Sequence, residues 1–151
     1  MDKVTLKALI TSALKELGLH SDNAVNLLMG TAAQESHLGK YRKQIGGGPA
    51  LGIFQMEPAT FNDIVRNYLR YKPELAVKIE RVARVCRFHA EDIETNDLLA
   101  ICMARVHYLR VSEAIPSDVE GMARYWKKYY NTPLGKGTVE EFISNYKKLV
   151  G

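Results

Sequence analysis

The chain contains 151 residues, a length typical of one globular domain. Apolar residues make up 46% and charged residues 25%, so the composition excludes a disordered acidic tail, a collagen-like fibre and a disulfide-dense toxin. Lysine and arginine outnumber the acids by 21 to 17, which gives a formal charge of +4. This mild excess favours an anionic partner, and both cell-wall polymers and nucleic acids qualify.

Helical periodicity dominates the chain. An apolar stripe predicts a helix over 3–17, and a second helix is expected to start after Ser21 or Asp22 and to reach about Glu35. Residues 40–56 contain four glycines and a proline, which exclude a regular helix. An irregular segment that can hold a short β-hairpin is therefore expected there.

The helical pattern continues through the rest of the chain. Proline at a first helical position and the apolar spacing predict helices that begin at Pro58 and Pro73 and that cover 96–113, 118–130 and 139–150. The expected caps of the last three are Thr95, Ser117 with Glu120, and Thr138 with Glu141. Because no repeat or linker divides the chain, we predict one mainly α domain over 1–151, with about six to eight helices.

The sequence shows neither the pattern of a signal peptide nor that of a membrane-spanning segment. The N-terminus lacks the apolar stretch of a signal peptide, and no run reaches the roughly 20 apolar residues needed to cross a bilayer. We therefore expect a soluble protein that does not insert into membranes. The histidines His20, His89 and His107 lack metal-ligand spacing, so no bound metal is expected.

Glu35 continues an apolar helix face. The other members of this face, at helical spacing, are Val25, Leu28, Met29 and Ala32. Burial raises the pKa of a carboxyl group, which is the adjustment that a general acid needs near neutral pH. The alternative is that the helix frays at this point and Glu35 faces water.

Gln55 is a second candidate, because it is the single amide in the apolar stretch 51–56. A glycine such as Gly52 lets the backbone approach a ligand closely, and a glutamine side chain offers both a donor and an acceptor. Together with a nearby acid, these residues suit a carbohydrate-binding wall. The alternative is a buried strand whose glutamine is satisfied by the protein itself.

Four short motifs occur in a characteristic order: Glu35-Ser36, then Gly52-Ile53-Phe54-Gln55, then Tyr108-Leu109, then Tyr130-Asn131. They resemble the Glu-Ser, Gly-Leu-Met-Gln, Tyr-Leu and Tyr-Asn motifs of the lytic transglycosylase branch of the lysozyme superfamily, to which goose-type lysozymes are related. The resemblance covers roughly residues 22–137. In its small size and missing export signal, the chain is similar to bacteriophage muralytic proteins.

This resemblance implies a lysozyme-like domain that degrades peptidoglycan without a metal or cofactor. The bond cleaved would be the β-1,4 bond between N-acetylmuramic acid and N-acetylglucosamine. Glu35 would act first as general acid and then as base, closing a 1,6-anhydro ring on the muramoyl product. The residues that the resemblance assigns to substrate binding are Ser36, Gly52, Gln55, Tyr130 and Asn131.

Several of these residues also allow structural roles. Ser36 can cap the end of its helix, Tyr108 can belong to the core, and Asn131 can form a turn before Pro133.

Glu57 departs from the motif, because transglycosylases carry a methionine at this position and goose-type lysozymes an aspartate. A second carboxylate can activate water, and the inverting geometry asks for two carboxyl groups about 6.5–9.5 Å apart. Glu57 also directly precedes Pro58, where it can simply favour the start of a helix. The transglycosylase outcome is the favoured expectation, with a hydrolytic muramidase as the alternative.

Two further classes of protein are compatible with parts of the sequence. A nucleic-acid-binding protein is disfavoured, because the basic residues between 42 and 87 are spread over several helices without helix-turn-helix spacing. A non-catalytic virion component is a third possibility, since a fold does not guarantee activity. The expected partners are peptidoglycan glycan strands and, in a virion, other phage proteins. The protein would be made in the host cytoplasm and act on the bacterial cell wall.

Overall fold

The structure is a computed structural model that describes residues 1–44, 46–131 and 135–151. Within these ranges the chain forms seven α-helices, which are α1 (Lys3–Leu17), α2 (Asp22–Ser36), α3 (Pro58–Asn67), α4 (Pro73–Ala83), α5 (Asp97–Leu109), α6 (Val119–Trp126) and α7 (Val139–Leu149). Two 3-10 turns, η1 (Leu69–Tyr71) and η2 (Ala90–Glu94), and a π-helical turn, η3 (Lys127–Asn131), complete the set. The prediction of a mainly α fold is confirmed. None of these helices is long and apolar enough to span a bilayer.

A side-chain cap marks the start of most helices. Two of the observed caps lie one residue after the residue that the sequence predicted. Ser21 and Thr138 accept hydrogen bonds from backbone amides of α2 and α7, as expected. In α5 and α6 the caps are Asn96 and Asp118, so the predictions of Thr95 and Ser117 were wrong. In both pairs two neighbouring residues are good caps, and the amide or carboxylate oxygen is the one that reaches the helix amide.

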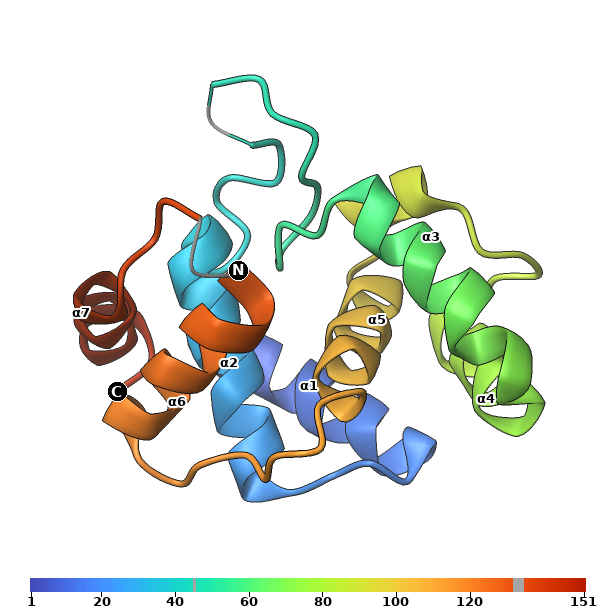
Figure 1. The fold of residues 1–151 in the computed structure, drawn as a ribbon, viewed down its shortest axis with the longest axis horizontal. Helices are drawn as coiled ribbons and strands as arrows, with labels where there is room; N and C mark the ends of the chain where they lie inside the picture. The colour runs from blue at the N-terminus through green and yellow to red at the C-terminus, as the bar shows by residue number, and fades with distance from the viewer. Residues whose placement is uncertain (45, 132–134) are drawn as a thin grey trace.

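Helix α2 lies at the centre of the fold and contacts α1, α5, α6 and α7. Helices α6 and α7 pack on one side of it, while α3 and α4 lie beyond α5 (Figure 1). Ten of its fifteen residues are buried, which is typical of a helix surrounded by others. At Gly30, a Cβ atom would lie 2.5 Å from the ring of Phe142, so the glycine allows α7 to approach closely.

The segment between α2 and α3 is irregular, as predicted, and it arches over one end of the helices (Figure 1). Its β structure among the described residues is limited to two isolated bridges, Lys43 with Leu51 and Leu51 with Met56, rather than a hairpin of paired strands. Leu51 and Met56 exchange both backbone hydrogen bonds, at 3.1 and 3.2 Å. This closes a tight loop around Gly52, which adopts a φ of 79°.

We predict that Gly52→Ala destabilises the fold more than Gly46→Ala. Both glycines have positive φ, which costs alanine about 1 kcal/mol. At Gly52 an added Cβ would also overlap the carbonyl oxygen of Ile93, whereas Gly46 has open space around it. We expect a loss of about 2–4 kcal/mol in the free energy of unfolding for Gly52→Ala, measured by urea denaturation. Equal losses in the two variants would contradict this explanation.

Candidate active site

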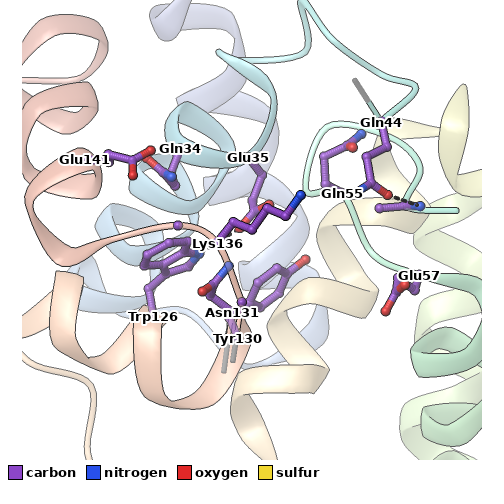
Figure 2. A pocket seen from close by; sticks show the side chains of 13 residues that line it. Gln34, Glu35, Gln44, Gln55, Glu57, Trp126, Tyr130, Asn131, Lys136 and Glu141 are labelled. Atoms are coloured by element: carbon purple, nitrogen blue, oxygen red, sulfur yellow. Dashed lines mark hydrogen bonds between the residues drawn. The ribbon is translucent and has the colours of Figure 1, made fainter. Parts of the chain in front are cut away.

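A cavity of about 560 Å³ opens where the end of α2 meets the irregular segment and the connection from η3 to α7 (Figure 2). Its walls come from parts of the chain that are distant in sequence. The lining residues are Gln34, Glu35, Gln44, Ala50, Gln55, Glu57, Trp126, Tyr130, Asn131, Gly135, Lys136, Gly137 and Glu141. Five of the predicted site residues therefore share one cavity, and they are Glu35, Gln55, Glu57, Tyr130 and Asn131.

Glu35 lies in the last turn of α2, and its carboxyl group faces the cavity above Trp126 (Figure 2). The helix does not fray at this point, since it continues to Ser36. The indole Nε1 of Trp126 donates a hydrogen bond to Oε2 of Glu35 at 2.9 Å. Burial raises the pKa of Glu35 to about 7, and the hydrogen bond from the indole opposes this rise by stabilising the carboxylate. The group is therefore available in both protonation states near neutral pH.

Ser36 does not line the cavity, so the structure does not bring it together with the other predicted site residues. Its role in substrate binding stays a prediction. Its side chain is fully buried, and its hydroxyl donates to the carbonyl oxygen of Ile53 at 2.6 Å. The hydroxyl oxygen of Ser36 in turn accepts a hydrogen bond from the amide of Gly39 at 2.8 Å. Ser36 therefore ties the end of α2 to the irregular segment, which is the capping role left open by the sequence.

Gly52 is also absent from the cavity wall, and its role in substrate binding stays a prediction. It is buried against η2, where its amide donates to the carbonyl oxygen of Arg42 at 2.7 Å. Its role is to let the backbone turn tightly beside Ile93, and this turn positions Gln55 three residues later.

Gln55 lines the cavity, and its amide is also held by the protein's own backbone. The two N–H groups of its side chain are shared among the carbonyl oxygens of Tyr41, Arg42 and Gly52, which lie 3.1, 2.9 and 2.9 Å from the nitrogen and fix the orientation of the amide. Among the described residues, none donates a hydrogen bond to Oε1 of Gln55. This oxygen is therefore an available acceptor on the wall of the cavity.

Tyr130 and Asn131 belong to the π-helical turn η3, whereas the predicted regular helix ends at Trp126. Residues 132–134 of the turn predicted after Tyr130 lie outside the described residues. The hydroxyl of Tyr130 donates to the carbonyl oxygen of Phe54 at 2.6 Å, and its ring stacks on Tyr108 with centroids 5.3 Å apart. Tyr130 thus joins η3 to the irregular segment across the cavity floor. Asn131 accepts a hydrogen bond from Lys127 at 2.7 Å.

Tyr108 is a core residue, which is the structural role that the sequence left open for it. It is 2% exposed, and its hydroxyl lies 2.8 Å from Oγ1 of Thr31. Because Thr31 donates its own proton to the carbonyl oxygen of Leu27, the tyrosine is the donor in this pair. Tyr108 therefore supports Tyr130 from behind.

Glu57 is exposed and precedes the first residue of α3, where its side chain makes no capping hydrogen bond. It lines the same cavity as Glu35, but the two carboxyl groups approach from different walls (Figure 2).

Sequence reasoning missed Trp126 and Lys127. Trp126 is 91 residues away from Glu35, and no local pattern connects the two. The described residues hold no group of three or more His, Cys, Asp or Glu side chains suited to a metal ion.

No protein family, curated protein or solved structure matches this chain. The assignment of the cavity therefore rests on its residues and their geometry.

We predict that Glu35→Gln stabilises the folded protein at alkaline pH but not at acidic pH. Because the pKa of Glu35 is higher in the folded state, the wild type loses stability as the pH rises from about 4.5 to about 7. Glutamine keeps a hydrogen-bond acceptor for Trp126 without carrying a charge. Urea unfolding is expected to show a gain of up to about 3 kcal/mol at about pH 8 and none at about pH 4. The same difference at both pH values would contradict the buried position of this carboxyl group.

Proposed function

We propose that this protein degrades peptidoglycan by cleaving the β-1,4 bond between N-acetylmuramic acid and N-acetylglucosamine, as a lytic transglycosylase. The observation that carries the proposal is the carboxyl group of Glu35, which faces a cavity and has a pKa of about 7. A general acid is most effective when its pKa lies near the working pH. The ordered motifs that resemble those of transglycosylases support the choice of substrate.

In the proposed reaction, protonated Glu35 donates its proton to the glycosidic oxygen as the bond to the muramoyl C1 breaks. The resulting carboxylate then takes the proton of the muramoyl 6-hydroxyl, whose oxygen forms a bond to C1. This closes the 1,6-anhydro ring and returns Glu35 to its protonated state, so no water is consumed. A single carboxyl group suffices because its pKa suits both proton transfers.

The other cavity residues would hold and orient the sugars. Oε1 of Gln55 can accept a hydrogen bond from a hydroxyl or an acetamido N–H group, because its nitrogen is already committed to three carbonyl oxygens. The hydroxyl of Tyr130 is committed to Phe54, so its ring contributes an apolar surface against which a sugar face can pack.

A hydrolytic muramidase is the second candidate, because Glu57 supplies another carboxylate to the same cavity. In that reaction Glu57 would activate a water molecule while Glu35 protonates the leaving oxygen, and the product would carry a reducing end. We place either enzyme at the bacterial cell wall, as a phage lysin or as part of a virion. A virion component without activity remains the outcome if no glycan is cleaved.

We predict that Glu35→Gln abolishes the clearing of a peptidoglycan suspension. Loss of a general acid lowers rates by roughly 10²–10⁴-fold, and the variant should remain folded because the substitution removes a buried charge. Circular dichroism checks the fold and turbidity measures the activity. Clearing at the wild-type rate by a folded Glu35→Gln variant, or no clearing by the wild type, would refute the catalytic assignment.

Mass spectrometry of the released muropeptides distinguishes the two products, and we expect 1,6-anhydromuramoyl ends from the wild type. Glu57→Gln is expected to keep both the activity and these ends. Reducing ends from the wild type, together with a loss of activity in Glu57→Gln, would assign the reaction to hydrolysis.

We also predict that Trp126→Phe shifts the alkaline limb of the pH–rate profile to higher pH. The reaction needs protonated Glu35, so kcat/KM of the wild type should fall above about pH 7. The indole N–H lowers the pKa of Glu35, and phenylalanine keeps an aromatic ring but removes this donor. A profile of kcat/KM against pH measures the limb, and a shift to lower pH would contradict the role of this hydrogen bond.

A further inference from the structure

Lys136 extends across the cavity in front of Glu35, with its ammonium end directed toward the side that carries Gln55 (Figure 2). Among the described lining residues it is the only cation, whereas Glu35, Glu57 and Glu141 contribute carboxyl groups. No carboxylate of the described residues lies within 4.0 Å of its ammonium group, in contrast to the ion pairs found elsewhere in the chain. The lysine is therefore positioned over the cavity without a protein partner of opposite charge.

The backbone on both sides of Lys136 is held by another lysine, Lys127 of η3. Its ammonium group donates to the carbonyl oxygens of Gly135 and Gly137 at 2.8 and 2.6 Å, and to Oδ1 of Asn131 at 2.7 Å. Three acceptors use all three protons of the ammonium group. Lys127 thus binds to the protein itself, while the neighbouring lysine of the loop is left for a ligand.

Both glycines around Lys136 are packed closely. A Cβ at Gly135 would lie 2.5 Å from the carbonyl oxygen of Asn131, and one at Gly137 would lie 2.6 Å from Cη2 of Trp126. The loop therefore rests on the same indole that donates to Glu35. This contact places the cation in a defined relation to the proposed acid.

We propose that Lys136 determines specificity by binding a carboxylate of the glycan substrate, with Lys127 as its positioning residue. The proposal rests on the function proposed above and names the group that this cavity recognises beside the sugars. A charge-assisted hydrogen bond to an ammonium group is about twice as strong as a neutral one. Because the other lining residues with acidic or basic side chains are the acids Glu35, Glu57 and Glu141, none of them attracts an anionic group, and the position beside Lys136 is the one that favours it.

Two carboxylates of peptidoglycan carry this chemistry. One is the lactyl carboxylate of a muramoyl residue whose peptide has been removed, and the other belongs to the stem peptide. The test uses catalytically inactive Glu35→Gln protein, so that binding is measured without cleavage. Its ligands are soluble glycan oligomers in three forms: bearing peptides, stripped of peptides, and stripped with the lactyl carboxylates amidated.

In isothermal titration calorimetry, adding Lys136→Met is expected to weaken binding of the recognised oligomer roughly tenfold, as for the loss of one charge-assisted bond. Binding of the amidated oligomer should not change, and Lys136→Arg should retain most of the affinity. A loss confined to the stripped oligomer identifies the lactyl carboxylate, and one confined to the peptide-bearing oligomer identifies the stem. Lys128→Met is the matched control, since Lys128 is an exposed lysine of η3 that does not line the cavity.

The proposal is overturned if Lys136→Met leaves all affinities unchanged or weakens the amidated oligomer equally. Wild-type clearing of peptidoglycan separates this failure from that of the proposed function. If the wild type clears peptidoglycan but Lys136→Met does not change any oligomer affinity, only the role of Lys136 is refuted. If the wild type does not clear peptidoglycan and no oligomer binds, both the role of Lys136 and the proposed function are refuted.

The positioning role of Lys127 is tested by a double-mutant cycle in the same binding assay. If Lys127 acts through Lys136, adding Lys127→Met to Lys136→Met should cause little further loss of affinity. Additive losses would show that Lys127 acts on binding independently of Lys136 and would overturn the assignment.

Discussion

The hydrogen bond between Trp126 and Glu35 joins α6 to the end of α2 at the cavity, and it depends on the packing of three helices. The indole comes from α6, the carboxyl group from α2, and Phe142 of α7 packs against the indole with ring centroids 5.4 Å apart. Gly30 allows this arrangement, because any side chain there would collide with Phe142. The orientation of the proposed acid is therefore determined by the core, and Gly137 of the Lys136 loop packs closely against the same indole.

Such an acid lowers the stability of the fold that holds it. Raising the pKa of a carboxyl group from 4.5 to about 7 costs about 3 kcal/mol at neutral pH, a large share of the 5–15 kcal/mol that stabilises a typical domain. The central position of α2 offsets this cost, since most of its residues are buried against four other helices. We infer that the extensive burial of α2 supplies the stability that allows a buried acid to be held at its end.

Local patterns in the sequence predicted the parts of the fold and site that are themselves local. The apolar stripe and caps of α1, α2 and α7 led to bounds close to those observed, and the acid on an apolar helix face identified Glu35. Pairings between distant residues could not be predicted, so the contact of Trp126 with Glu35 was missed. The turn η3 was missed because a π-helix departs from the spacing of 3.6 residues. Ser36 and Gly52 show that a motif residue can serve the site by holding its walls together.

The proposed choice between ring closure and hydrolysis depends on which oxygen lies beside Glu35 after the leaving group departs. A carboxyl group with a pKa of about 7 can remove a proton from a sugar hydroxyl or from water, so its acidity does not decide the product. The product is decided by which oxygen, that of the 6-hydroxyl or that of water, lies beside Glu35. In the proposed reaction, a cation that binds a carboxylate of the substrate would fix the muramoyl residue along the cavity and so determine whether its 6-hydroxyl meets Glu35. Glu57 is exposed at the start of α3, so water that it activates would have to compete with an oxygen already in place. The intramolecular acceptor is therefore favoured in the proposed reaction, and the register of the substrate in the cavity is the main determinant of the product.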